Sequence, residues 1–266
     1  MREAWALIRA SWRTALSYRL SMVFSLLSLL VTVAPLFFVA QALQPIMSKS
    51  IASQGGEYFG FLLVGMIAFS YIMIAVNSVP GVVSGGIANG TLEALLSTRA
   101  PIPALLSGLI GYGFVWTTLR AIVLLGAGLA LGVHLAWGAW LSSSLILALI
   151  VLAYIPFGLL SAAMVLAFRT TGPLPSVVLI ASSLLGGVYY PTQVIPSWIQ
   201  RVSEVIPLTY GLRALRQTLL EGMPIGAVLP DVATLVGFVL LLTAVSLFAL
   251  SEALHYARRS GTLAQY

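Results

Sequence analysis

The sequence predicts an all-α, polytopic membrane protein with six transmembrane helices, and three observations carry that prediction. Of its 266 residues, 60% are hydrophobic and only 8% are charged, whereas ordinary soluble domains carry about 25% charged residues. The mean hydropathy is +1.04. The apolar residues also fall into long runs, and a helix needs ~20 such residues to cross ~30 Å of hydrocarbon. Helices are expected because unpaired backbone groups cannot face lipid.

Residues 1–19 are expected to form an amphipathic helix that lies in the membrane interface. Its apolar face consists of Trp5, Ile8, Trp12 and Leu16, which recur at steps of three and four residues. Arginines occupy the adjoining flank, where they would meet anionic headgroups. A topology anchor and a mechanical role both fit this helix. The apolar run Leu20–Ala42 is too long for the ~7–15-residue core of a signal peptide, so we expect it to be a retained span.

Six apolar segments are interpreted as the spans. They are Leu20–Leu43, Tyr58–Val79, Ala104–Val133, Leu141–Phe168, Leu174–Val188 and Val232–Leu254. Pro35 and Pro156 are expected to bend the first and fourth spans, which neighbouring helices in a membrane tolerate. Small residues near the end of the fifth span, such as Ser182 and Gly186, permit close helix packing.

One charged side chain, Arg120, falls inside a span. Counted from Ala104 at 1.5 Å per residue, it lies roughly 24 Å along the helix, in the far third of the membrane. A charge at the bilayer centre costs at least ~2.5 kcal/mol. Two placements avoid that cost. Arg120 either extends to the outer interface or faces a polar cavity or a subunit interface.

A semi-polar region, residues 189–231, separates the fifth and sixth spans. Pro196 and Ser197 open a short helix that ends at Ile206, and a second helix runs from Leu208 to Glu221. Both are too short and too charged to cross a membrane. We therefore expect a pair of short, re-entrant-like helices in the outer leaflet. The second carries leucines 208, 212, 215 and 219 on one side.

The basic residues predict the orientation. With the N-terminus inside, eight of them are cytoplasmic: Arg2, Arg9, Arg13, Arg19, Arg99, Arg169, Arg258 and Arg259. Four are outside: Lys49, Arg201, Arg213 and Arg216. This excess predicts that both termini are cytoplasmic. It also places the polar segment 84–103, between spans two and three, in the cytoplasm.

Motifs for catalysis are not found. The chain has no cysteine, which excludes thiol nucleophiles and cysteine metal sites. Lys49 and Ser50 lack the upstream glycines of a phosphate-binding loop. His134 and His255 are far apart and Asp231 is the only aspartate, so neither a zinc site nor a paired-carboxylate site is expected. A serine–histidine dyad would require one of these histidines at the membrane edge. We expect no enzyme activity and no bound cofactor or metal, with energy supplied by another protein.

Two stretches resemble the type-2 permease subunits of ATP-binding-cassette exporters. The first, Gly90-Thr91-Leu92-Glu93-Ala94-Leu95-Leu96-Ser97-Thr98 ahead of Pro101, is similar to the family's cytoplasmic GTLE-x-L segment between spans two and three. The second comprises Tyr190-Pro191, Pro196-x-Trp198 and Pro207-Leu208-Thr209-Tyr210, continuing through Arg216 to Gly222. It resembles the family's segment between spans five and six. Together with the six-span layout, the resemblance covers nearly the whole chain.

The resemblance implies that the first stretch is a coupling helix that docks in a groove of an ATPase subunit. The implied contacts are Asn89, Gly90, Thr91, Leu92, Glu93, Leu95, Leu96 and Arg99. Thr91 can cap this helix and its leucines offer an apolar face. Glu93 is either a charged contact to the ATPase or a solvated carboxylate at a helix N-terminus. Tyr190, Pro191, Pro207, Tyr210 and Arg216 are candidates for an outer gate. Headgroup anchoring is the alternative for Tyr210 and Arg216.

The resemblance thus implies a permease subunit in the cytoplasmic membrane of a prokaryote. Its partners would be an ATPase subunit that binds ATP and magnesium, and a second permease copy, identical or similar, with membrane lipids around them and no role for nucleic acid. The aromatic, mostly uncharged spans favour an amphiphilic cargo such as a lipid, a glycolipid or a drug. The alternative function is an ATP-independent scaffold or channel whose cytoplasmic loop binds a partner. An intramembrane hydrolase is a third hypothesis.

Overall fold

A computed structural model describes residues 19–88, 102–168 and 172–259, and every regular element within these ranges is a helix. The helices are α2 (Arg19–Met47), α3 (Tyr58–Ala88), α5 (Ile102–Ala130), α6 (Trp140–Phe168), α7 (Leu174–Leu185), α8 (Ser197–Ser203), α9 (Pro207–Leu219) and α10 (Leu229–Arg259), with short 3₁₀ turns η1 (Trp137–Ala139) and η2 (Thr192–Val194). The predicted interfacial helix and the core of the coupling segment lie outside the described residues.

Five of the described helices are long and apolar enough to cross a membrane. Their candidate spans are Met22–Met47, Tyr58–Gly86, Gly111–Ala130, Trp137–Val165 and Leu229–Ala253. These helices agree with the prediction of a helical, multi-pass membrane protein.

The fifth predicted span, Leu174–Val188, is shorter than expected. Its helix, α7, has 12 residues and is therefore about 18 Å long, well below the ~30 Å of a hydrocarbon core. The helix stops before Gly186 and Gly187, and Gly187 has a φ of +80° that disfavours other residues. The chain then continues in an extended conformation at Pro191. Six full-length spans stay a prediction.

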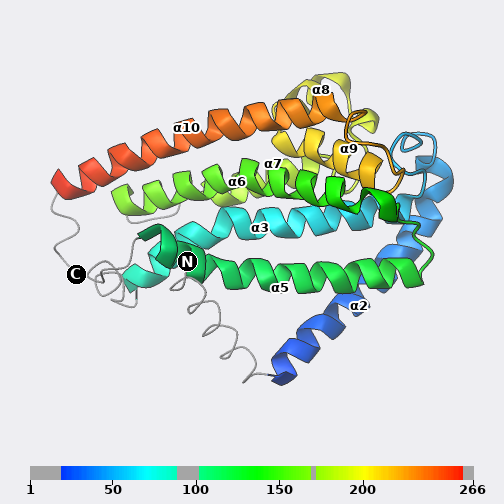
Figure 1. The fold of residues 1–266 in the computed structure, drawn as a ribbon, viewed down its shortest axis with the longest axis horizontal. Helices are drawn as coiled ribbons and strands as arrows, with labels where there is room; N and C mark the ends of the chain where they lie inside the picture. The colour runs from blue at the N-terminus through cyan, green and yellow to red at the C-terminus, as the bar shows by residue number, and fades with distance from the viewer. Residues whose placement is uncertain (1–18, 89–101, 169–171, 260–266) are drawn as a thin grey trace.

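Helices α3, α5, α6 and α10 lie side by side, while α2 slants away from them (Figure 1). Helices α3, α6 and α10 run in one direction, and α2 and α5 run in the other. The short helices α8 and α9 gather at one end of the bundle, where α2 ends and α10 begins. We call this the α9 end. Both predicted short helices between spans five and six are present, although α8 ends at Ser203, three residues before the predicted Ile206.

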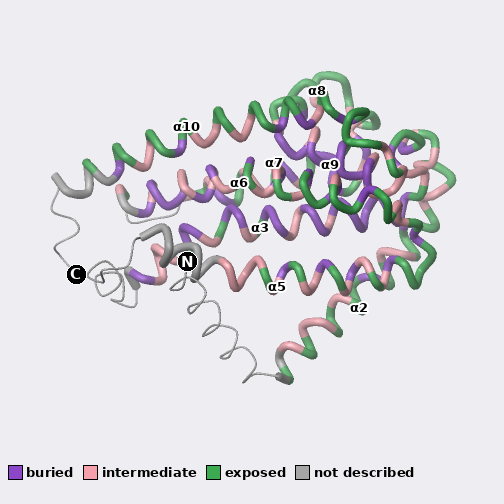
Figure 2. Tube along the Cα trace, viewed as in Figure 1, coloured by how far each residue is buried: buried purple, intermediate pink, exposed green. Residues whose placement is uncertain are grey.

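Helix α3 is the centre of the bundle, and Figure 2 shows it as the most continuously buried of the long helices. In an 18-residue apolar stretch of its candidate span 72% of the residues are buried, against 11% in the corresponding stretch of α2 and 17% in that of α10. One core cluster joins α3 to α6, α9 and α10, and a second joins it to α2 and α5. The exposed faces of α2 and α10 are rich in large apolar side chains, as expected for surfaces in hydrocarbon.

Helix α3 also corrects the prediction that span two ends at Val79. It continues through Pro80 to Ala88. Proline lacks an N–H, so the carbonyl of Val76 loses its helical donor. Gly158 of α6 lies against this carbonyl, because a Cβ on Gly158 would be 2.6 Å from the oxygen of Ala75 and 3.2 Å from that of Val76. A Cα–H group can partly compensate the freed carbonyl at such a crossing.

We predict that Gly158→Val destabilises the bundle by about 1–3 kcal/mol, because the added side chain forces α6 away from the α3 backbone. The measurement is the melting temperature of the detergent-solubilised protein, followed by size-exclusion chromatography. Gly126→Val in α5 is the matched control, since a Cβ there would meet nothing within 4 Å. Equal melting temperatures for the two variants would contradict the proposed close crossing.

Candidate functional site

Helix α9 carries the site, and its sequence explains its place. Pro207 occupies the first turn of α9. An N–H at this position would have no acceptor within the helix, so proline is tolerated there. Of the four leucines on the predicted face, Leu208, Leu212 and Leu215 are almost fully buried in the core, and Leu219 is half-buried. A Cβ on Gly211 would lie 2.4 Å from Cγ1 of Ile150. The backbone of α9 therefore packs directly onto α6.

Arg216 of α9 is buried as well, with 2% of its surface exposed. Its Nε and Nη2 donate to the carbonyl oxygen of Phe61 in α3 at 3.2 and 3.0 Å. Nη2 also donates to the carbonyl of Val188 at 3.2 Å, and Nη1 donates to Oε1 of Gln54 at 3.4 Å. One guanidinium thus joins α9, α3, the segment after α7 and the loop before α3.

The surroundings of Arg216 fit a cation. Its guanidinium carbon lies 3.3 Å from the centroid of the Phe61 ring, a favourable position for a cation over an aromatic face. A Cβ on Gly65 would approach Nη2 to 2.7 Å and the Val188 oxygen to 2.4 Å, so only glycine leaves the space. Burial lowers the pKa of Arg216 to about 9, which keeps the group charged at neutral pH. We name Arg216, Phe61, Gly65, Val188 and Gln54 the Arg216 cluster.

The segment after α7 is fixed at a second point. The hydroxyl of Tyr58, at the start of α3, donates to the carbonyl of Tyr189 at 2.8 Å. The ring of Tyr58 stacks on that of Phe61 at 6.0 Å. Consecutive carbonyls, those of Val188 and Tyr189, are therefore both bound by side chains that belong to or contact α3. This segment carries two of the predicted gate residues, Tyr190 and Pro191.

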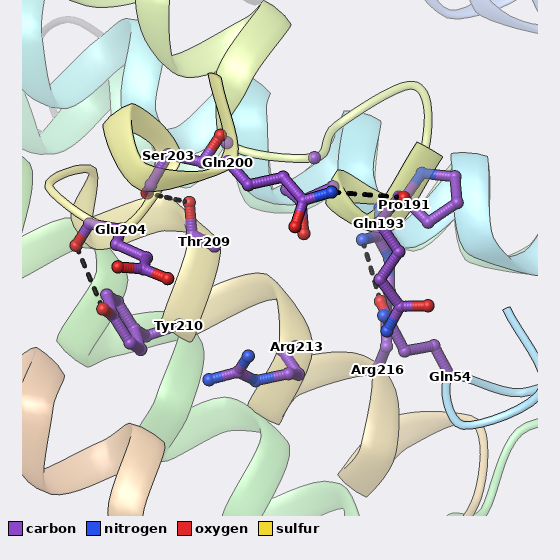
Figure 3. Close-up of a pocket in the computed structure, with 13 residues that line it drawn as sticks. Gln54, Pro191, Gln193, Gln200, Ser203, Glu204, Thr209, Tyr210, Arg213 and Arg216 are labelled. Carbon is purple, nitrogen blue, oxygen red and sulfur yellow. Dashed lines mark hydrogen bonds between the residues drawn. The ribbon is translucent and has the colours of Figure 1, made fainter. Parts of the chain in front are cut away.

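A polar cavity of about 180 Å³ lies beside the Arg216 cluster. Figure 3 shows the side chains around it, which come from α8, α9, the segment between α7 and α8, and the loop before α3. Its polar lining includes Gln54, Gln193, Gln200, Glu204, Thr209, Tyr210 and Arg213. Gln200 is held at this edge because its amide donates to the carbonyl of Ile195 at 2.7 Å. The cavity is below the ~300 Å³ of small-molecule sites and has room for about six waters.

Tyr210 and Arg213 connect α9 to its neighbours α8 and α10. The Tyr210 hydroxyl donates to the carbonyl of Glu204 at 3.0 Å, which ties α9 to the end of α8. Arg213 forms a two-pronged ion pair with Asp231 at the start of α10. The hydrogen bond with Asp231 raises the pKa of Arg213. Its guanidinium also lies 5.5 Å from the Tyr210 ring centroid.

Further hydrogen bonds connect the remaining loops at the α9 end. Gln44 of α2 accepts from the Tyr58 N–H at 2.6 Å and donates to the Gly56 carbonyl at 2.8 Å. The Gly55 N–H donates to Glu221 at 2.7 Å. The Ala136 N–H donates to the Leu219 carbonyl at 2.9 Å. Every loop at this end is thereby linked to α9 or to the start of α3.

The structure brings together part of the predicted site. Tyr210, Arg216 and Pro191 line the polar cavity, whereas Pro207 is buried at the start of α9 and Tyr190 is half-buried. The burial of Arg216 does not fit the alternative of headgroup anchoring. The implied ATPase contacts at residues 89–99 lie outside the described residues.

Arg120 stays unassigned. It is half-buried in α5, about 15 Å from the Ala130 end at 1.5 Å per residue. Within the described residues it makes no hydrogen bond. Its orientation towards a cavity or a subunit interface is still a prediction.

Sequence reasoning missed the partners of Arg216. In the sequence Gln54 lies between the first two predicted spans, and Phe61 and Gly65 look like ordinary members of an apolar span. The glycine was the one available signal, because a glycine inside a span marks a close approach by another group. Among the described residues, no three His, Asp or Glu side chains lie close enough to hold a metal ion.

We predict that Arg216→Met destabilises the α9 end, because the Val188 carbonyl loses its buried donor at a cost of about 1–3 kcal/mol. The measurements are the melting temperature in detergent and the rate of proteolysis at residues 186–206. Arg216→Lys should recover only part of the loss, since an ammonium cannot bridge all three acceptors. Arg201→Met, on an exposed side chain of α8, is the control. A melting temperature for Arg216→Met equal to that of this control would contradict the role of the cluster.

Comparison with known proteins agrees with this architecture. A family model described as "ABC-2 type transporter" matches residues 3–220. Proteins named inner membrane transport permease YadH from Escherichia coli K12, from E. coli O6:H1 and from Shigella flexneri are each 28% identical over 167 residues. These alignments cover 61% of this chain and 63% of each relative. Because the family model spans most of the sequence, the chain belongs to the ABC-2 type transporter family, a family of transport permeases whose ATPase is a separate subunit.

Proposed function

We propose that this chain is the membrane subunit of an ATP-driven exporter in the inner membrane of a prokaryote. Two copies, or one copy with a similar partner, enclose a path for an amphiphilic molecule. A separate ATPase subunit binds ATP and magnesium and engages residues 89–99. The family and the name of the permease relatives support the transport role. The sequence carries no phosphate-binding loop that would supply ATPase activity itself.

The Arg216 cluster is the observation that carries the mechanism. It fastens α9 and the segment after α7 onto α3 at one end of the bundle, and we assign it as the closed outer gate. Opening this end requires the Val188 carbonyl to separate from the guanidinium. The hydrogen bonds of such a buried cluster are either formed or broken, with no stable intermediate arrangement. The cluster can therefore act as a two-state switch.

Helix α3 provides the mechanical connection between the ATPase and the gate. It ends at Ala88, directly before the coupling segment, and it begins at Tyr58, beside the Arg216 cluster. Phe61 and Ala88 are 27 residues apart, or about 41 Å at 1.5 Å per residue. Because α3 is the most buried span, a shift at the coupling segment moves the Phe61 carbonyl with the rest of the helix.

The cargo is proposed to be amphiphilic. The long helices expose mostly apolar side chains, especially on α2 and α10, while the cavity at the α9 end is polar. A path that begins among such helices and ends at this cavity suits a molecule with an apolar body and a polar headgroup.

The contact with the ATPase is tested by Glu93→Arg. The charge reversal places a cation in the proposed docking groove, so we expect the recovery of the ATPase with the tagged permease to fall by roughly tenfold or more, equivalent to about 1.4 kcal/mol. Vanadate-sensitive ATP hydrolysis in the purified complex should fall in parallel.

Glu57→Arg is the matched control. Glu57 is an exposed acid at the α9 end, paired with His134 at 3.5 Å, and its reversal should leave the ATPase bound. Loss of binding in Glu93→Arg alone supports the coupling contact. If no ATPase accompanies the folded wild-type protein in mild detergent, the exporter proposal is wrong and an ATP-independent scaffold or channel replaces it.

A further inference from the structure

A second cavity, of about 250 Å³, opens between α5 and α6. These two helices have little direct contact, while α3 packs against both and forms the floor between them. We name this cavity the α5–α6 groove. Its walls include Ile67, Tyr71, Ala121, Leu125, Trp140 and Leu147. None of these residues belongs to the Arg216 cluster or to the polar cavity.

The groove is elongated along the bundle. Its lining comes from Val64–Tyr71 of α3, Thr118–Leu125 of α5 and 140–147 of α6, and each stretch rises about 10 Å at 1.5 Å per residue. Tyr71 and Thr118 are the lining residues farthest from the α9 end on their helices, and the Tyr71 hydroxyl donates to Oγ1 of Thr118 at 2.9 Å. This bond joins α3 to α5 at the inner end of the groove. The shape fits a chain that lies parallel to the helices, as lipid tails do.

The groove offers almost no polar group to a ligand. Thr118 donates to the carbonyl of Phe114 at 2.9 Å. Ser143 donates to Thr218 at 3.1 Å, and Ser144 donates to the carbonyl of Trp140 at 2.8 Å. With the Tyr71 bond, each hydroxyl donor in the lining is already used within the protein. A ligand is therefore recognised by apolar contact alone.

The rim has a different character. Trp137 and Trp140 stand at the α9 end of the groove with 67% and 62% of their surfaces exposed. Neither indole N–H donates a hydrogen bond to another of the described residues. Tryptophan favours the boundary between hydrocarbon and headgroups, where its ring is apolar and its N–H can meet a lipid oxygen. The groove thus has an apolar interior and a rim suited to an ester or phosphate.

We propose that the α5–α6 groove holds one acyl chain of a bilayer phospholipid, whose glycerol and phosphate region lies at Trp137 and Trp140. The helices that line it are candidate membrane spans, so the medium at its open side is lipid. Its volume is below the ~300–1,000 Å³ of sites that enclose whole small molecules, and its walls rise only about 10 Å, so it takes the headgroup-proximal part of one acyl chain and not a complete lipid. The chain fills a packing gap between α5 and α6 that the protein leaves open.

Groove-filling variants test this proposal. Ser144 is exposed on α6 and lines the groove, so Ser144→Phe should occupy the site of the chain. Ile122→Trp fills the same groove from α5 and serves as a second variant if the first misfolds. Ser251→Phe is the matched control, because Ser251 is an exposed serine of α10, outside the groove, whose hydroxyl also bonds to its own helix.

The purified proteins are washed in detergent, and phospholipid phosphate per protomer is measured. Each is then photolysed with a phosphatidylethanolamine that carries a diazirine on one acyl chain, and the labelled peptides are mapped. We expect wild type and Ser251→Phe to retain about one more phospholipid per protomer than either groove variant. Labelling of residues 118–125 and 140–147 should fall several-fold in the groove variants alone.

Two outcomes would overturn the proposal. One is equal lipid retention and equal labelling in Ser144→Phe, Ile122→Trp and wild type, with label spread evenly over α10, which would mean that only ordinary surrounding lipid is present. The other is a wild-type groove that takes no label while a cysteine at position 144 cross-links two permease chains. A second copy would then cover the groove. Neither outcome depends on the ATPase or on the direction of transport.

Discussion

The buried guanidinium of Arg216 is the interaction on which the α9 end depends. Taking a charge out of water costs several kcal/mol unless polar partners replace the solvent. Here the replacement comes from the carbonyls of Phe61 and Val188, the amide of Gln54 and the face of the Phe61 ring. Within the described chain no carboxylate binds this group. The buried charge is therefore stable only while α3, α9 and the segment after α7 stay in contact. Any motion of α3 relative to α9 would weaken these hydrogen bonds.

The packing of the other helices holds the Arg216 cluster in place. Helix α3 contacts most of the other helices and passes through the whole molecule, while α2 and α10 keep wide apolar faces. Glycines place the helices close enough for backbone groups to take part. Gly65 admits the guanidinium, Gly158 covers the carbonyl freed by Pro80, and Gly211 lets α9 lie on α6. The α5–α6 groove is the contrasting case, since there the protein leaves a gap that lipid can fill.

Much of the fold could be predicted because hydrophobic length and period are local signals. The long spans, the short pair α8 and α9, and the leucine face of α9 follow from apolar runs and from Pro207. Several boundaries differ from the prediction: α5 ends at Ala130, three residues before the predicted Val133, α8 ends at Ser203, and spans two and five differ as well. Helix α3 continues past Pro80, and Gly158 of α6 lies close to the carbonyls of Ala75 and Val76 there, while α7 stops at Leu185, before two glycines.

The site was less predictable than the fold. Arg216 and Tyr210 were recognised through their place in a familiar stretch, but the sequence could not show that Arg216 points inward. Its partners lie 28 to 162 residues away in the chain. Because every residue has a backbone carbonyl, the sequence does not indicate which carbonyls accept these hydrogen bonds. From the sequence alone, an arginine on a short helix between spans is expected at the surface. Only the structure shows which acceptors its five N–H groups bind.

The accessibility of Val188 tests most directly whether the Arg216 cluster is a gate. The chain has no cysteine, so Val188→Cys introduces a single thiol at a position with 0% exposure. Its reaction with a membrane-impermeant maleimide is followed in the permease–ATPase complex, with and without ATP and vanadate, and Val205→Cys, at a 70% exposed position, serves as the reference. A gate predicts that the Val188→Cys rate rises roughly tenfold or more in the trapped state, as the population shifts towards the open form, while the reference is unchanged. Protection of Val188→Cys in every nucleotide state, in a complex that still transports, would contradict the gate.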